Sequence, residues 1–210
     1  IAAGNWVLRH TAAANTTNAY ALYLNAATSN TITGFFARNP IGAAIDIFRG
    51  SYNTISRSTA SSSAGGYYVA MLLDATSRNT ISASYIINTP GAGAFLNGSA
   101  NFNTITLSTM IGSGTAPNGT SNPGLYLYSG PSNNTVTFSY MRGGMGAMIL
   151  GGSANAISQS TMVSVNAGAP GMNFFGSVLN TVTGSYMFNA NGFGLNFQQS
   201  ANSNTISQST

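Results

Sequence analysis

Short stretches in which apolar residues alternate with small hydroxyl residues recur along the whole chain. The stretch from Asn103 to Met110, Asn-Thr-Ile-Thr-Leu-Ser-Thr-Met, is typical of them. Alternation with a period of two indicates a β-strand that buries one of its faces. The pattern therefore predicts a chain of many short strands, and helix is not expected to be its main secondary structure.

A tripeptide, Asn-Thr-Ile or Asn-Thr-Val, begins most of these stretches. Complete copies begin at Asn30, Asn53, Asn79, Asn103, Asn134, Asn180 and Asn204, and degenerate copies begin at Asn5 and Asn155. These nine asparagines, which we call anchors, follow one another at intervals of 25, 23, 26, 24, 31, 21, 25 and 24 residues. Repeats built from helix pairs are longer, at about 33 to 47 residues. The spacing therefore predicts one coil of a stacked β-solenoid per anchor.

Equivalent positions after each anchor form columns of similar residues. The second position is always Ile or Val, the fifth is Ser in seven repeats, and the seventh is Ala, Ile or Met. In stacked coils each column becomes a ladder with a pitch of about 4.8 Å. We expect two inward apolar columns with a hydroxyl ladder at a corner between them, and in most coils a further strand that follows a glycine. The anchors are expected to turn inward at a bend, where their amides can bond the neighbouring coils.

This pattern resembles the right-handed parallel β-helix repeat of the pectate-lyase-like superfamily, whose usual coil signature is Asn-x-Ile-x-x-Asn/Ser-x-Ile. The resemblance extends from Asn5 to Thr210 and is closest in style to large bacterial surface and fibre repeat proteins. It implies an all-β fold in which residues 1–210 form one right-handed parallel β-helix with about 25 residues per coil. It does not select a function, because the superfamily includes polysaccharide lyases and hydrolases, phage tailspikes and surface repeat proteins.

A finer period lies within the repeat. The sixth position after the anchor alternates strictly between Thr and an aromatic residue, and the longer coils are those that contain Thr. The true unit is therefore a pair of coils, about 50 residues long. The aromatic residues, which we call the aromatic row, are Phe36, Tyr85, Tyr140 and Tyr186. They either cover the smaller Thr residues beside them or offer platforms for sugar rings or a neighbouring fibre, roughly 9.6 Å apart.

Composition narrows the chemistry that the chain can perform. Only 4% of its 210 residues are charged, its formal net charge is +4, and it contains no cysteine. Thiol chemistry and disulfides are thereby excluded. The arginines form no cluster of the kind that binds nucleic acid, and no apolar run approaches the length of about 18 residues that a membrane span needs. A surface rich in Asn, Ser, Thr and Gly is typical of an extracellular or cell-surface protein.

The two acidic residues, Asp46 and Asp74, are the only candidates for acid and base catalysis. They fall in successive coils, and Arg49, Arg57 and Arg78 lie near them in the sequence. Surface ion pairs are the expectation for such a group. Two carboxylates can act together only if the fold brings them close, and a calcium site would need more of them. We therefore predict no catalytic residue, no cofactor and no metal site.

The leading hypothesis from sequence is a non-catalytic structural or adhesive β-solenoid of a fibre, a surface stalk or a giant repeat protein. Neither end of the sequence shows a polar cap, so we expect a segment of a longer array, or self-association end to end or laterally. The alternative is a carbohydrate-binding or carbohydrate-cleaving β-helix that uses the aromatic row or the region of Asp46 and Asp74. A further alternative is ice binding by the regular Thr-x-Thr/Ser face that flanks the second position after each anchor.

Overall fold

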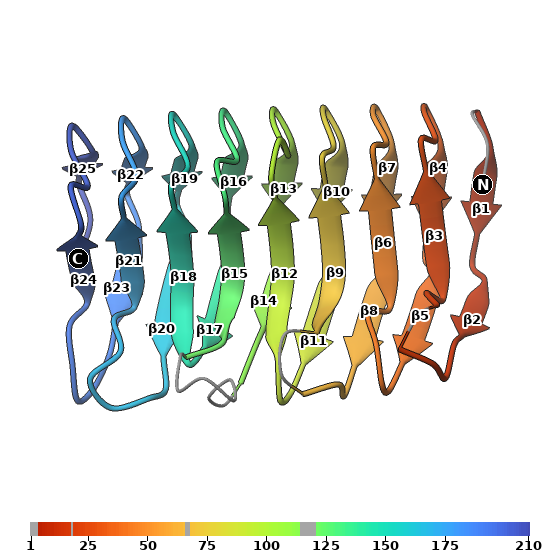
Figure 1. Ribbon diagram of the computed structural model, residues 1–210, viewed down its shortest axis with the longest axis horizontal. Helices are drawn as coiled ribbons and strands as arrows, with labels where there is room; N and C mark the ends of the chain where they lie inside the picture. The colour runs from red at the N-terminus through yellow and green to blue at the C-terminus, as the bar shows by residue number, and fades with distance from the viewer. Residues whose placement is uncertain (1–3, 18, 66–67, 114–120) are drawn as a thin grey trace.

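The computed structural model describes residues 4–17, 19–65, 68–113 and 121–210. Within them the chain winds through about eight turns of a right-handed parallel β-solenoid, with about 24 residues in each turn. The turns stand side by side along the long axis of the molecule (Figure 1). The described part of the chain has no helix with the length and hydrophobicity needed to span a membrane.

Each full turn contributes one strand to each of three parallel sheets, which we call A, B and C. Sheet A begins directly after the anchors and contains β1 (Trp6–Leu8), β4 (Thr31–Thr33), β7 (Thr54–Ser56), β10 (Thr80–Ser82), β13 (Thr104–Thr106), β16 (Thr135–Thr137), β19 (Ala156–Ser158), β22 (Thr181–Thr183) and β25 (Thr205–Ser207). Sheet B contains β2 (Thr11–Ala13), β5 (Phe36–Asn39), β8 (Thr59–Ser62), β11 (Tyr85–Asn88), β14 (Thr109–Ile111), β17 (Tyr140–Gly143), β20 (Thr161–Ser164) and β23 (Tyr186–Phe188). Sheet C contains β3 (Leu22–Asn25), β6 (Ile45–Phe48), β9 (Val69–Asp74), β12 (Ala92–Asn97), β15 (Pro123–Tyr128), β18 (Met145–Leu150), β21 (Met172–Phe175) and β24 (Leu195–Gln198).

The register of the sheets follows the columns of the sequence. In sheet A, Ile81 pairs with Ile55 on one side and with Ile105 on the other. In sheet B, Met110 pairs with Ile86 and Met141. The β-solenoid fold predicted from the repeat is therefore confirmed, and like residues stack on like residues along the axis.

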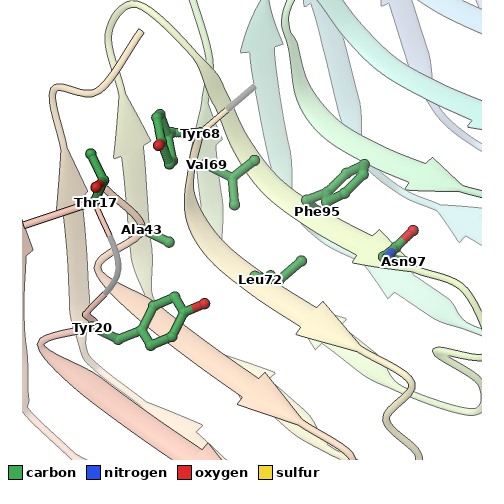
Figure 2. A pocket seen from close by; sticks show the side chains of 8 residues that line it. All are labelled: Thr17, Tyr20, Ala43, Tyr68, Val69, Leu72, Phe95 and Asn97. Carbon is green, nitrogen blue, oxygen red and sulfur yellow. The ribbon is translucent and has the colours of Figure 1, made fainter. Parts of the chain in front are cut away.

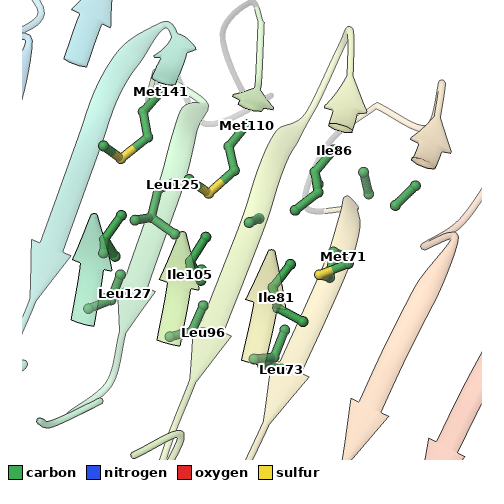
Figure 3. Close-up of a cluster of buried hydrophobic side chains, with 14 of the residues drawn as sticks. Met71, Leu73, Ile81, Ile86, Leu96, Ile105, Met110, Leu125, Leu127 and Met141 are labelled. Carbon is green, nitrogen blue, oxygen red and sulfur yellow. The ribbon is translucent and has the colours of Figure 1, made fainter. Parts of the chain in front are cut away.

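The interior is a continuous apolar column to which all three sheets contribute. Figure 3 shows Ile81 and Ile105 of sheet A, Met110 of sheet B, and Leu73 and Leu96 of sheet C among the side chains of this core. Each of these five side chains is at most 1% exposed. Burial of such a side chain contributes about 1.5 to 3 kcal/mol, so the core is the main source of stability.

The corners between sheets are made largely by residues other than glycine. The residue four positions after every anchor has a positive φ, from 47° at Ala83 to 64° at Gly34. The residue before every anchor also has a positive φ, from 53° at Ala154 to 71° at Gly4. The left-handed conformation costs about 1 to 2 kcal/mol for a residue with a Cβ. It is held here because neighbouring coils bend at the same place and bond across the bend, as the Leu107 amide does to the Thr137 carbonyl at 3.1 Å.

The structure places the anchors in one hydrogen-bonded ladder. The backbone amide and the Nδ2 of Asn53 both donate to Oδ1 of Asn79, at 2.9 Å each, and Nδ2 also donates to the Ala27 carbonyl at 2.9 Å. The same pair of bonds to the next Oδ1 links every anchor to its successor. The members of this ladder are Asn5, Asn30, Asn53, Asn79, Asn103, Asn134, Asn155, Asn180 and Asn204. Because each buried amide group has several hydrogen-bond partners, the asparagine side chains can point into the solenoid without leaving a donor unpaired.

The serine column forms a second ladder at the corner between sheets A and B. The Ser84 amide donates to Oγ of Ser108 at 3.2 Å, and Oγ of Ser84 donates to the Ser82 carbonyl at 2.8 Å. Each hydroxyl thus accepts a bond from one coil and donates within its own. The hydrogen bonds of both ladders form only in the same register, so neighbouring coils cannot shift by one residue without losing bonds in two places.

Candidate functional site

The aromatic row lies on the outer face of sheet B. Each of its residues opens a strand, and the exposed fractions are 40% for Phe36, 41% for Tyr85, 37% for Tyr140 and 44% for Tyr186. A threonine occupies the same place on the strands between them, as the pairing of Tyr85 with Thr109 and of Thr109 with Tyr140 shows. The row therefore presents separate aromatic rings on every second strand.

The two acidic residues lie on sheet C, on neighbouring strands. Asp46 of β6 pairs with Leu72 of β9, so Asp74 of β9 lies two residues further along the same face. Sheet geometry, about 4.8 Å between strands and 3.3 Å per residue, separates their Cα atoms by roughly 8 Å. The fold thus brings together two carboxylates that are 28 residues apart in the sequence.

Asp46 lies in a row of outward positions that crosses sheet C. Its register partners on successive strands are Tyr23 on one side and Leu72, Phe95 and Tyr126 on the other. The rings of Tyr20 and Tyr23 stack with centroids 5.0 Å apart. The acid is therefore set among aromatic and apolar side chains on the outside of the solenoid.

A cleft of about 220 Å³ opens on this face. Its lining residues are Thr17, Tyr20, Ala43, Tyr68, Val69, Leu72, Phe95 and Asn97 (Figure 2). Ala43, Val69 and Ala92 form a small buried apolar cluster, against which Tyr20, Leu72 and Phe95 pack. The cleft is thus mainly apolar, with the phenol of Tyr20 at one end and the amide of Asn97 at the other.

The carboxyl group of Asp46 is almost completely withdrawn from water. The residue is 3% exposed, and among the described residues its Oδ1 has no hydrogen-bond partner. The pKa of Asp46 is raised to about 6: burial is the largest cause, a hydrogen bond from Tyr20 acts in the opposite direction, and the charge of Asp74 makes a smaller raising contribution. Burial and the neighbouring Asp46 carboxylate raise the pKa of Tyr20 to about 12, so its hydroxyl stays a proton donor. Asp46 is therefore a carboxyl group that can hold or release a proton near neutral pH.

Two of the arginines near Asp46 in the sequence, Arg49 and Arg78, lie against aromatic rings. The Arg49 guanidinium carbon is 4.7 Å from the centre of the Phe48 ring. That of Arg78 is 5.7 Å from the Tyr52 ring and 5.3 Å from the Phe102 ring. None of them is among the groups that shift the pKa of Asp46. The ion pairs expected from the sequence therefore do not explain the environment of Asp46. Arg49 and Arg78 lie at bends of the chain and contact aromatic rings instead.

Polar and aromatic groups continue the site beyond Asp46. The Asn97 Nδ2 donates to Oδ1 of Asp74 at 3.0 Å, which orients that carboxylate. The rings of Phe95, Tyr126 and Tyr128 form one cluster, with centroids between 5.1 and 5.8 Å apart. Burial raises the pKa of Tyr126 to about 12, so this phenol also stays protonated. Among the described residues there is no group of three or more acidic, histidine or cysteine side chains that could hold a metal ion.

Analysis of the sequence did not identify Tyr20, Phe95 or Tyr126 as members of this site. Counted forward from the anchor, the distance to this row of sheet C varies between 14 and 23 residues, because the connection after sheet B varies in length. Counted backward from the next anchor, the row that contains Asp46 and Phe95 always falls seven or eight residues away. This nearly constant backward distance is the feature of the sequence from which the row could have been located.

Comparison with known proteins supports the fold. A family model described as a right-handed beta helix region matches residues 3–140. The crystal structure of the periplasmic alginate epimerase AlgG superposes with a TM-score of 0.70 at 13% identity, covering 91% of this chain and 47% of that one. The A-module of mannuronan C-5 epimerase AlgE6 from Azotobacter vinelandii gives a TM-score of 0.62 at 13% identity, covering 88% of this chain and 58% of that one.

A phage protein shares the fold as well. Tailspike protein 2 from Escherichia coli O157:H7 bacteriophage CAB120 gives a TM-score of 0.62 at 10% identity, covering 93% of this chain and 33% of that one. The chain thus spans about half the length of AlgG and one third of the tailspike chain. No curated protein sequence matches it.

Proposed function

The chain belongs to the right-handed β-helix family, and on that premise we propose that it binds a polysaccharide across the outer face of sheet C and cleaves it with the help of Asp46. Three structures with the same fold are named as an alginate epimerase, a mannuronan epimerase and a phage tailspike. Their identities to this chain are low, so the proposal rests on the site itself. The non-catalytic fibre favoured from sequence is less well supported than this alternative.

The observation that carries the proposal is the burial of Asp46 on the outer face of sheet C, close to Asp74. This carboxyl group, whose pKa is raised to about 6 and which is hydrogen-bonded by the cleft residue Tyr20, has no role in the hydrophobic core or in the anchor ladder. Burying an acid with an unpaired oxygen is destabilising. Carboxyl groups with strongly raised pKa values in clefts are characteristic of sites of proton transfer.

The surroundings of Asp46 suit a sugar chain. Sugar rings offer an apolar face of C–H groups, which packs on aromatic rings such as Phe95 and Tyr126, and a rim of hydroxyl groups, which bond to amides and carboxylates such as Asn97 and Asp74. Sheet C places both kinds of group on one face, on the neighbouring strands β9, β12 and β15. A polysaccharide that lies across these strands would meet rings and hydrogen-bonding groups in turn.

The two carboxyl groups provide a route for hydrolysis of a glycosidic bond. Protonated Asp46 donates its proton to the glycosidic oxygen as the bond to the anomeric carbon breaks, while Asp74 takes a proton from the water that attacks that carbon. The two Cα atoms are roughly 8 Å apart, and the mechanism requires the carboxyl groups themselves to lie about 6.5 to 9.5 Å apart, which leaves room for such a water. We further propose that the protein acts outside the cytoplasm, where such polymers occur.

The proposal is tested by separate measurements of binding and turnover. Affinity electrophoresis and calorimetry on alginate, mannuronan, pectate and dextran would identify the ligand, and reducing-end release would report cleavage. We expect Asp46→Asn to bind like the wild type and to lose cleavage, and Phe95→Ala with Tyr126→Ala to weaken binding. Phe138→Ala is the matched control, because Phe138 is 55% exposed at the corner between sheets A and B.

Each outcome bears on one part of the proposal. Absence of binding to all four polymers, or unchanged binding by the Phe95 and Tyr126 variant, would overturn the binding site on sheet C. Binding without cleavage, or cleavage that persists in Asp46→Asn, would overturn the catalytic role of Asp46.

A further inference from the structure

The outer face of sheet B is a second, chemically different surface. Along its strands the aromatic row and the position two residues after it both point outward, as the alternating exposure of β5 and β17 shows. Arg38 therefore lies beside Phe36, and Arg142 beside Tyr140. This face presents rings and cations, whereas both carboxylates of the chain belong to strands of sheet C.

The spacing of the rings is longer than packing alone requires. One threonine strand separates consecutive rings, so the rings recur roughly every 9.6 Å, twice the distance between strands. That distance is comparable to the length of one disaccharide unit in an extended polysaccharide. All four residues are more than one third exposed, which leaves room for a sugar ring to stack; at Tyr186 one face of the ring is already stacked on Phe188, with centroids 5.7 Å apart.

Arginines accompany the first and the third of the four rings, whereas the same position beside Tyr85 and Tyr186 holds Ile87 and Phe188. Arg38 and Arg142 lie on β5 and β17, which are separated by four strand spacings in the order of sheet B, or roughly 19 Å. Two disaccharide units of an extended chain would therefore place one acidic group at each arginine. With no carboxylate side chain on the sheet, an anion meets no repulsion there.

We propose that the outer face of sheet B binds one anionic polysaccharide, of the uronic acid type, lying parallel to the solenoid axis with alternate sugars stacked on Phe36, Tyr85, Tyr140 and Tyr186. Arg38 and Arg142 pair with its carboxylates. This site goes beyond the proposed function, since it lies on another sheet and needs neither Asp46 nor Asp74. A polymer held on sheet B would keep a long substrate close to the cleft on sheet C, which raises its effective concentration there.

The test uses calorimetry with sodium alginate, defined alginate oligosaccharides and neutral dextran. All variants are made in a Phe95→Ala/Tyr126→Ala background, so that sheet C does not contribute to the signal. Tyr85→Ala with Tyr140→Ala is expected to weaken alginate binding tenfold or more, at roughly threefold to tenfold per ring. Thr109→Ala, on the strand between these two rings, is the matched control and should change the affinity less than about twofold.

The arginines and the ligand length provide independent readouts. Arg38→Gln with Arg142→Gln should flatten the salt dependence of alginate binding and remove the preference over dextran. Affinity should rise steeply between a disaccharide and a hexasaccharide, because only the longer ligand reaches several rings. Circular dichroism spectra identical to the wild type would show that the exposed substitutions leave the fold intact.

Two results would overturn the proposal. One is alginate affinity in the Tyr85 and Tyr140 variant equal to that of its parent. The other is concentration-dependent association in sedimentation that this variant abolishes without any effect on alginate, which would make the row a contact between copies of the chain. If alginate binds only when Phe95 and Tyr126 are intact, the function proposed for sheet C stands and the site on sheet B does not.

Discussion

Replacement of Asp46 by Asn should remove a pH dependence of stability that this carboxyl group creates. In the folded protein its pKa is about 6, against an ordinary value of 3.8 in an exposed chain. Below about pH 3 the carboxyl group is almost fully protonated in both states and has no differential effect. As the pH rises from 4 to 6, the unfolded chain releases the proton first, so ionisation favours unfolding and the free energy of unfolding falls.

The magnitude follows from the difference in pKa. About two pKa units at 1.36 kcal/mol each correspond to about 3 kcal/mol of stability lost between about pH 3 and pH 7, most of it above pH 4. That is a large part of the 5 to 15 kcal/mol typical of a folded domain. Urea denaturation followed by circular dichroism at pH 4, 5, 6 and 7 would measure it in the wild type and in Asp46→Asn.

Asp74→Asn is the control that tests which group raises the pKa of Asp46. Burial is the largest contribution to the raised pKa of Asp46, and the charge of Asp74 is a smaller one. Asp74→Asn should therefore keep most of the dependence, while Asp46→Asn should be nearly flat over the same range. A wild type with equal stability at pH 4 and 7, or an unchanged slope in Asp46→Asn, would refute this account of the buried acid.

Three further predictions concern the solenoid itself. Asn103→Ala should lower the free energy of unfolding by about 2 to 5 kcal/mol, because the backbone amide and the Nδ2 of Asn79 both lose their bonds to Oδ1 of Asn103, at 3.0 Å each, and each unpaired buried donor costs about 1 to 3 kcal/mol. A loss below about 0.3 kcal/mol in urea denaturation would contradict the ladder. Gly124→Ala should destabilise by about 3 kcal/mol or more, since a Cβ there would lie 2.6 and 2.7 Å from backbone atoms of sheet B. Gly65→Ala is the control, because among the described residues its Cβ would meet no atom closer than 3.8 Å; equal melting temperatures of the two variants would exclude this close approach. Leu107→Gly should be neutral or stabilising by up to about 1 kcal/mol, because Leu107 is 64% exposed with a φ of 51° and glycine relieves the left-handed strain; a clear destabilisation would show that the leucine side chain contributes a contact.

The anchor, serine and aromatic columns could be assigned from sequence because each lies within seven residues of an anchor. In a stacked coil an error of one residue would turn Ile105 outward and Thr104 inward, so the alternation itself identifies the buried face. Like residues then recur at like positions, and the ladder of anchors follows from their number and spacing. The count of coils and the parallel pairing therefore required no information beyond the repeat.

The site on sheet C could not be derived in the same way. The connection between sheets B and C changes length from coil to coil, and a shift of one residue in a strand moves a side chain to the opposite face. The backward distance to the next anchor is seven residues for Asp46 and eight for Phe95, although both side chains face outward, so a fixed count would assign one of them to the wrong face. The burial of Asp46 also depends on Tyr20, which belongs to the previous coil and reaches it only in the folded solenoid.

What the sequence by itself determined is the solenoid: its period, its inward columns, its polar ladders and the alternation of rings on one face. These depend on short-range patterns that every coil repeats. Only the tertiary structure decided that the corners bend through left-handed residues as unlike as Leu107 and Gly34, and that Asp46 is a buried acid beside Asp74 instead of a member of a surface ion pair. The physical reason is that left-handed backbone and a raised pKa are imposed by the neighbouring coils, through hydrogen bonds across each bend and through side chains that exclude water from one carboxyl group.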